Sequence, residues 1–327
     1  MNKRIKKIIL IAVGIIAALF ILEIIWWYFP VKRIQLAQFR DSNAVVDAEI
    51  SSRYGSPMRK LLVSIAEEKA LREMPAGFKQ RVVRRGISIA FPQEIMLEVI
   101  SKSTAEKPVY LVGLDFGRAI KLFRKIKPRL ENQIFQGRPV SESEVNGYRF
   151  ISREEPDIVH ERAMNAGVWI DSGLVMCSSP EYLRKLLEQY KKSSHPEETA
   201  LAPISVKLDN QTAYLTDKIR GYEKKYNYEI FSSIDRVQSV DLEVNTQNKD
   251  AIQGKMIFHG KSELSEDDPM ISDVNFFYGV LRRKLRPEGI ELRGEESHSG
   301  KDVKLTMELT GFSSALSQLQ NLSKEEK

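Results

Sequence analysis

The pattern of apolar and polar residues changes several times along the chain, and each change predicts a different element. Apolar residues fill positions 8–29 almost without interruption, which is typical of a membrane-spanning helix. Residues 57–74 then place apolar side chains at helical spacing, whereas residues 86–91 alternate as a strand does. From residue 92 onward, helical and strand patterns follow one another at short intervals.

The first thirty residues carry the strongest signal. Basic residues precede the apolar run and aromatic residues close it: Lys3, Arg4, Lys6, Lys7, Trp26, Trp27 and Tyr28. A helix rises about 1.5 Å per residue, so about 20 residues cross the hydrocarbon core of a bilayer. The basic flank is expected in the cytoplasm and the aromatic cluster at the far interface.

We therefore predict a cytoplasmic tail and transmembrane anchor over residues 1–30 in the inner (cytoplasmic) membrane, with the bulk of the chain outside the cytoplasm. The alternatives are a cleaved signal peptide and a buried helix of a soluble protein. The signal peptide is disfavoured because no small-x-small cleavage site follows the apolar run. Residues 31–84 are expected to form a helical stalk, in which Ser56 caps a helix that begins at Pro57.

Residues 85–208 are expected to form a first α+β half. Its predicted elements are a strand at 86–91, a helix at 92–101, a strand at 109–116, a helix at 118–130, strands at 147–152 and 167–177, a helix at 179–190 and a strand at 204–208. The predicted strand at 167–177 is broken at 171–173. This order is that of the split βαβ, or ferredoxin-like, arrangement. Residues 131–146 carry no periodic apolar pattern and are expected to form a loop.

Residues 209–327 are expected to form a second half of the same kind. Its predicted elements are a helix at 210–226, strands at 237–244 and 251–259, a helix at 268–285, a hairpin of 290–293 with 303–309, and a closing helix at 312–322. The fold class expected for the chain is therefore α+β, with antiparallel sheets covered by helices on one face.

Composition narrows the class of protein. The 327 residues are 42% hydrophobic and 29% charged, which excludes a disordered chain. The formal net charge is +6, which is mild for this length, so no nucleic-acid partner is expected. With one cysteine, Cys177, no disulfide can form within the chain.

Candidate chemistry is sparse. The four histidines lie far apart and outside metal-binding spacing: His160, His195, His259 and His298. Cys177 ends a predicted buried strand and is expected to be a core residue. An enzyme would need Asp115, Asp171 and Glu154 to converge in a cleft, and Asp115 is better explained as a helix cap. We expect no catalytic residue, no cofactor and no metal.

One helix is rich in basic residues. Arg118, Lys121, Arg124 and Lys125 fall within the predicted helix at 118–130. Near a bilayer they would attract anionic headgroups, at about 1 kcal/mol for each charge, or they would bind an acidic partner. The alternative is an ordinary solvated helix face.

Two stretches resemble a known family. VYLVGLDFGRAIKLFRKI and GVWIDSGLVMCSSPEYLRKLLEQY, within residues 108–192, are similar to a widespread uncharacterised family of bacterial membrane-anchored envelope proteins. The resemblance implies a membrane-anchored extracytoplasmic domain and no catalytic residue. The plan of anchor, stalk and split βαβ modules is also similar, in architecture alone, to inner-membrane scaffold subunits of type II secretion and type IV pilus machines.

These observations predict a non-enzymatic, single-pass envelope protein with a structural or scaffold role. Its expected partners are the lipid bilayer and other envelope proteins. The alternative is an extracytoplasmic binding module that holds an apolar or anionic ligand between its sheet and its helices.

Overall fold

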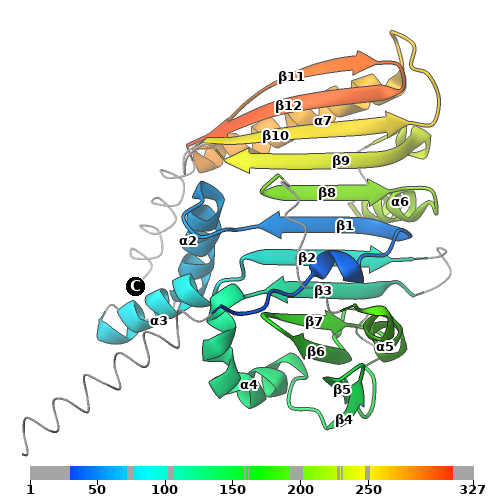
Figure 1. Ribbon diagram of the computed structural model, residues 1–327. Helices are drawn as coiled ribbons and strands as arrows, with labels where there is room; N and C mark the ends of the chain where they lie inside the picture. The colour runs from blue at the N-terminus through cyan, green and yellow to red at the C-terminus, as the bar shows by residue number, and fades with distance from the viewer. Residues whose placement is uncertain are drawn as a thin grey trace, which may run out of the picture.

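The computed structural model contains one continuous antiparallel sheet of twelve strands (Figure 1). The structure describes residues 30–71, 77–101, 107–157, 160, 162–191, 202–226, 229, 231–246 and 251–311. The strands are β1 (Ala44–Ser51), β2 (Glu94–Ile100), β3 (Val109–Asp115), β4 (Val140–Val145), β5 (Tyr148–Arg153), β6 (Ala166–Ile170), β7 (Gly173–Cys177), β8 (Ile204–Asp209), β9 (Val237–Thr246), β10 (Ala251–Gly260), β11 (Glu291–Ser299) and β12 (Asp302–Thr310). Their order across the sheet is β11-β12-β10-β9-β8-β1-β2-β3-β7-β6-β5-β4.

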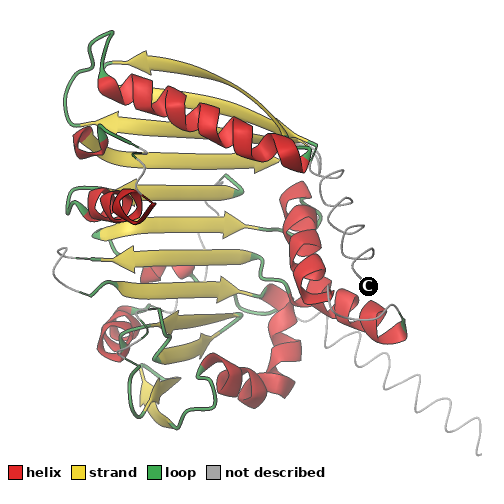
Figure 2. Ribbon diagram, turned by 180° about the vertical axis from the view of Figure 1, so that it is seen from behind, coloured by secondary structure: helices red, strands yellow, loops and turns green. Residues whose placement is uncertain are grey.

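Helices lie on both sides of this sheet. The helices are η1 (Leu36–Phe39), α2 (Pro57–Leu71), α3 (Phe78–Ala90), η2 (Gly117–Ala119), α4 (Ile120–Ile134), α5 (Pro180–Gln189), α6 (Tyr214–Tyr226), η3 (Ile234–Arg236), α7 (Pro269–Leu285) and η4 (Arg286–Glu288). Seen from behind, α6 and α7 lie over strands β8 to β11, and α2 crosses the ends of the central strands (Figure 2). On the opposite side, η1 and α5 cover the strands around β3 and β7 (Figure 1).

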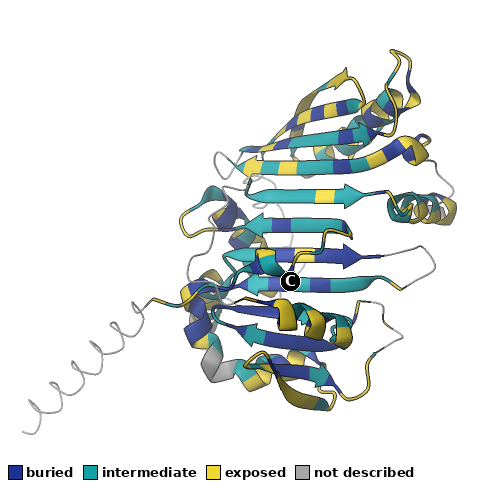
Figure 3. Cartoon of the chain, turned by 45° about the vertical axis from the view of Figure 1, so that its right-hand side comes forward, coloured by how far each residue is buried: buried dark blue, intermediate teal, exposed yellow. Residues whose placement is uncertain are grey.

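The strand sequences reflect this covering. β6 and β7 read AGVWI and GLVMC, nearly continuous apolar runs, because α5 packs on one face and α4 on the other. By contrast, β12 alternates buried and exposed residues along DVKLTMELT, because α7 packs on one face alone. Figure 3 shows the buried residues gathered in the strands below β8 and the alternation in those above it.

The chain enters the sheet through a segment that we call the strap, residues 31–43. The strap crosses the face of β1, β2 and β3 on the side of α5 and includes η1. Its apolar side chains Ile34, Leu36 and Phe39 are at most 3% exposed and pack in the same core as α5. Burial of three such side chains stabilises the strap by about 1.5–3 kcal/mol each.

Several helix starts agree with the sequence. The Ser179 hydroxyl accepts a hydrogen bond from the backbone N–H of Tyr182 at the start of α5. Asp268 caps α7 in the same way, and the Ser56 hydroxyl accepts from the N–H of Arg59 in α2. Each cap satisfies a backbone donor that the first helical turn leaves free.

The expected fold class is wrong. In place of two ferredoxin-like halves covered on one face, the strands form a single sheet with helices on both faces. The reason is β1, which lies inside the expected stalk and pairs with β2 on one side and β8 on the other. This strand joins the two parts of the chain into one ladder of hydrogen bonds, and local periodicity cannot reveal pairing between residues so far apart.

Three local predictions are also wrong. Residues 86–91, read as a strand, lie almost entirely in α3, which continues from Phe78 until Pro92 ends the helical backbone. Residues 94–100, read as a helix, form β2, which carries apolar residues on both faces and so lacks strand alternation. The expected loop at 131–146 contains the end of α4 and the edge strand β4, whose alternating serines and glutamates suit a solvated edge.

The predicted anchor is not supported as part of the fold. Residues 1–29 lie outside the described residues, so Lys3, Arg4, Lys6, Lys7, Trp26, Trp27 and Tyr28 have no described position. Throughout the ranges that the structure does describe, each helix is too short or too polar to cross a membrane. The predicted closing helix at 312–322 also lies outside the described residues.

Candidate functional site

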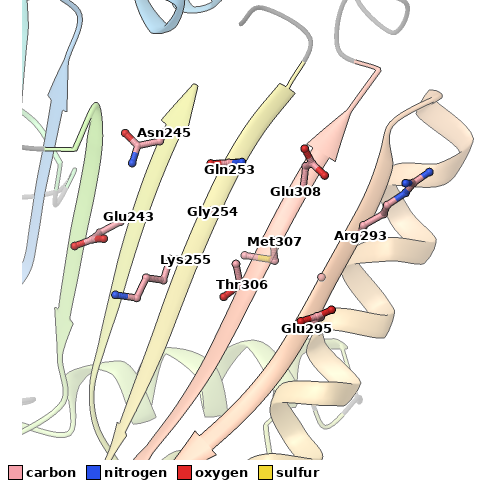
Figure 4. Close-up of a pocket in the computed structure, with 11 residues that line it drawn as sticks. Glu243, Asn245, Gln253, Gly254, Lys255, Arg293, Glu295, Thr306, Met307 and Glu308 are labelled. Atoms are coloured by element: carbon pink, nitrogen blue, oxygen red, sulfur yellow. The ribbon is translucent and has the colours of Figure 1, made fainter. Parts of the chain in front are cut away.

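Strands β9, β10, β12 and β11 expose a polar face. Their apolar residues pack against α7, which covers one face of these strands (Figure 2), and no helix in the described ranges lies over the other face (Figures 1 and 4). This face contains a shallow hollow of about 480 Å³. The residues that line it are Glu243, Asn245, Gln253, Gly254, Lys255, Arg293, Gly294, Glu295, Thr306, Met307 and Glu308.

The pairing register arranges the polar side chains of the hollow in two rows across the strands. One row runs Glu243, Lys255, Thr306, Glu295, and the next runs Asn245, Gln253, Glu308, Arg293. Because directly opposed residues of antiparallel strands lie on the same face, each row presents its side chains together (Figure 4).

The charges of the hollow are mixed. Three carboxylates face two cations, and within each row a cation has a carboxylate as its neighbour on the next strand. Arg293 also binds Glu291 on its own strand, with Nε 3.1 Å from Oε1, and this hydrogen bond raises the pKa of the guanidinium. The hollow therefore offers many hydrogen-bonding groups and no concentrated charge of one sign.

A histidine bridges three strands beside the hollow. Nδ1 of His259 lies 2.8 Å from Asp302 on β12, and Nε2 lies 3.1 Å from Asp241 on β9. A carboxylate only accepts hydrogen bonds, so the protonated imidazole can donate to both at once. This arrangement ties β9, β10 and β12 together at the end of the polar face.

A second cluster of charged residues is sealed beneath the strap. Asp115, at the end of β3, is fully buried and accepts hydrogen bonds from Arg33 Nε at 2.8 Å and Nη2 at 2.5 Å. It also accepts from Ser172 Oγ at 2.6 Å and from the N–H of Gly117 at 2.8 Å. Glu94 lies 3.6 Å from Arg33, and burial followed by the nearby Asp115 charge raises the pKa of Glu94.

The other end of the strap holds a second buried carboxyl group. Glu98 on β2 is fully buried and accepts hydrogen bonds of 3.2 Å to each oxygen from the N–H of Asp41. Burial raises the pKa of Glu98 to about 7. Asp41 in turn accepts a hydrogen bond from the Tyr182 hydroxyl, and burial raises the pKa of that tyrosine.

The predicted basic helix corresponds to η2 and the first part of α4. Of its four predicted contact residues, Arg118 is exposed, whereas Lys121 is 5% exposed. The side chains of Arg124 and Lys125 lie outside the described part of the structure.

The structure shows where most of the candidate chemical residues of the sequence lie. Cys177 is fully buried, and burial raises the pKa of its thiol to about 12, so it is a core residue as predicted. Asp115 lies beneath the strap, whereas Glu154 is exposed after β5. Within the described ranges, no three His, Cys, Asp or Glu side chains lie close enough to hold a metal ion.

Sequence reasoning did not single out the hollow. Its signal was present, because β9, β10 and β12 place polar residues at every second position over long stretches. That pattern predicts one solvated face, but it does not tell which strands share that face. Comparison with known proteins adds no further assignment, since no family model, curated protein or solved structure matches the chain.

Proposed function

We propose that the chain is a non-enzymatic scaffold that binds a protein partner through the hollow on the polar face of β9, β10, β12 and β11. The observation that carries the proposal is that some strands of the sheet are covered on both faces and others on one. Strands β3, β7 and β6 are covered on both faces, whereas the longest strands present a polar face that no described helix covers.

The shape and chemistry of the hollow favour a protein surface over a small ligand. A small-molecule site is concave and mostly apolar, with a few convergent polar groups. The hollow is shallow and its side chains are mostly polar or charged. Mixed charges of this kind give an interface its specificity and its orientation, because a partner must match each of them.

The non-enzymatic reading rests on where the ionisable groups lie. Acid–base catalysis needs a titratable group that is both perturbed and accessible. Asp115 and Glu98 are fully buried under the strap, where a substrate does not reach them. The carboxylates of the hollow, Glu243, Glu295 and Glu308, are exposed and solvated.

The place of this scaffold in the cell is a prediction from the sequence. The basic and aromatic flanks of residues 8–29 favour the inner membrane, and the resemblance over residues 108–192 favours the bacterial envelope. The expected partner is therefore another envelope protein whose surface carries both signs of charge.

The test uses the full-length protein in cells. A photo-crosslinking residue is placed at Gln253 or Thr306 in the hollow, and at Glu144 on β4 as the control position. We expect a specific crosslinked protein from the hollow positions and none from the control. The double charge reversal Lys255→Glu with Arg293→Glu is expected to reduce that crosslink at least tenfold.

A matched variant controls for net charge. Arg282→Glu with Arg283→Glu makes the same charge change at exposed positions of α7, on the covered side of the sheet. It is expected to leave the crosslink unchanged. Equal loss in both double variants, or crosslinks at Glu144 alone, would refute the hollow as the binding surface.

A further inference from the structure

The strap is attached to the sheet by two electrostatic contacts of different character. At its start, Arg33 is paired with the fully buried Asp115 and lies 3.6 Å from Glu94. The guanidinium of arginine does not lose its proton in the accessible pH range, so this contact persists. Between the contacts, Ile34, Leu36 and Phe39 anchor the strap in the core.

The contact at the end of the strap depends on a proton. The cation that acts on Glu98 is Arg40, which is already paired with Glu49. The groups around Glu98 come from every neighbouring element. They are Arg40 and Asp41 from the strap, Asp47 from β1, Tyr182 from α5 with Cys177 of β7 beside it, and the apolar Leu111 opposite on β3.

Ionisation of Glu98 would leave the Asp41 end of the strap with an excess of negative charge. Asp41, Asp47, Glu49 and Glu98 would then be four carboxylates at this end, where Arg40 is already paired with Glu49 and Lys207 of β8 lies opposite Asp47. One oxygen of Asp47 is buried without a hydrogen-bond partner. Like charges close together in a buried site repel strongly, because little solvent screens them.

We propose that the strap is a latch whose end at Asp41 loosens from the sheet when the buried Glu98 loses its proton. The end at Arg33 stays attached, so the strap opens from one side. Protonation of Glu98 removes the excess charge and keeps the segment closed over the core.

The linkage has a definite sign. Burial raises the pKa of Glu98 from 4.5 to about 7, with smaller contributions from Asp47 and Asp41, while the N–H of Asp41 opposes the shift. In the opened strap the carboxyl group meets water and regains its ordinary pKa. Opening is therefore disfavoured at low pH and becomes easier as pH rises from about 4.5 to 7.

Hydrogen exchange measures this opening directly. The full-length protein is exchanged at pH 6 and pH 8, and protection factors are compared, which removes the intrinsic pH dependence of exchange. We expect the protection of the amides of Gln38, Arg40 and Asp41, at the opening end of the strap, to fall about tenfold between these pH values, as the linkage relation gives for this shift. The amides of β3, β6 and β7 should keep their protection.

Substitutions test whether the proton that controls opening is the one on Glu98. Glu98→Gln has the same shape without the charge, so its strap protection is expected to be the same at both pH values. The control Glu144→Gln removes an exposed carboxylate of β4 and should keep the tenfold change. If Glu98→Gln fails to fold, Asp47→Asn serves instead, since loss of this like charge is expected to move the transition to lower pH.

Three results would overturn the latch. The first is strap protection that changes less than twofold between pH 6 and pH 8 in the unmodified protein. The second is a tenfold change that persists in Glu98→Gln. The third is an equal loss of protection throughout the sheet, which would indicate global unfolding in place of local opening.

Discussion

Replacement of Asp115 by alanine tests whether the buried ion pair holds the strap on the sheet. The substitution removes the acceptor of four hydrogen bonds, two from Arg33 and one each from Ser172 and Gly117. Breaking a buried ion pair by removing one partner costs about 3–5 kcal/mol. The side chain of Arg33 is 35% exposed, so water compensates part of its charge. We therefore expect the lower part of that range, about 3 kcal/mol.

Urea unfolding at pH 7, followed by circular dichroism, measures this loss as a lower midpoint with an unchanged slope. Asp115→Asn keeps the shape and one acceptor and is expected to cost about 1.5–3 kcal/mol. The control Asp267→Ala removes an exposed carboxylate and should stay within about 0.5 kcal/mol.

A double-mutant cycle with Arg33→Ala assigns the loss to the pair. If the contact is as the structure describes it, the two substitutions together cost at least 1 kcal/mol less than the sum of their separate effects, a coupling of about the size measured for contacting residues. A loss below about 1 kcal/mol for Asp115→Ala, or an additive cycle, would refute the stabilising role of this cluster.

The remaining predictions concern the core and its pH dependence. Gly173→Ala would place a Cβ 2.5 Å from Ile34 and 2.6 Å from the carbonyl oxygen of Leu114, so we expect thermal unfolding to show a loss of about 1–3 kcal/mol. Cys177 should resist thiol reagents at pH 8 in the native protein and react fully in urea; rapid native labelling would contradict its burial. The folded protein holds the Glu98 proton more tightly than the unfolded chain does. The free energy of unfolding in urea should therefore fall by about 3 kcal/mol between pH 4.5 and pH 7 because of this group, and Glu98→Gln should lack that part of the fall.

The elements of the sequence were more predictable than their arrangement. Helix α5 was read to within a residue because Ser179 and Pro180 mark its start and its leucines share one face. The hairpin of β6 and β7 was visible as a break at Asp171, whose positive φ of 49° fits a tight turn. Such signals lie within a few residues, so the sequence shows them directly.

The features that the sequence did not predict depend on contacts between residues far apart in the chain. β2 reads EIMLEVI, which fits a helix or a strand until one knows that β1 and β3 flank it. Glu98 looks like any glutamate in a mixed segment, and its burial becomes visible once Asp41 and Tyr182 are brought beside it. The hollow likewise depends on the register of four strands, which no local pattern specifies.

The order of the strands has a consequence for dissecting the molecule. Strands β1 to β7 occupy one side of the sheet without interruption, and strands β8 to β12 occupy the other. The two blocks have separate core clusters and meet along β1 and β8, where residues 46–50 pair with residues 204–208, and where α2 packs against β9. We expect a chain cut between residues 192 and 201 to yield two fragments whose reassociation restores the β1–β8 pair and the packing of α2 on β9. The protein is therefore expected to allow fragment complementation, in which β1 of one fragment pairs with β8 of the other.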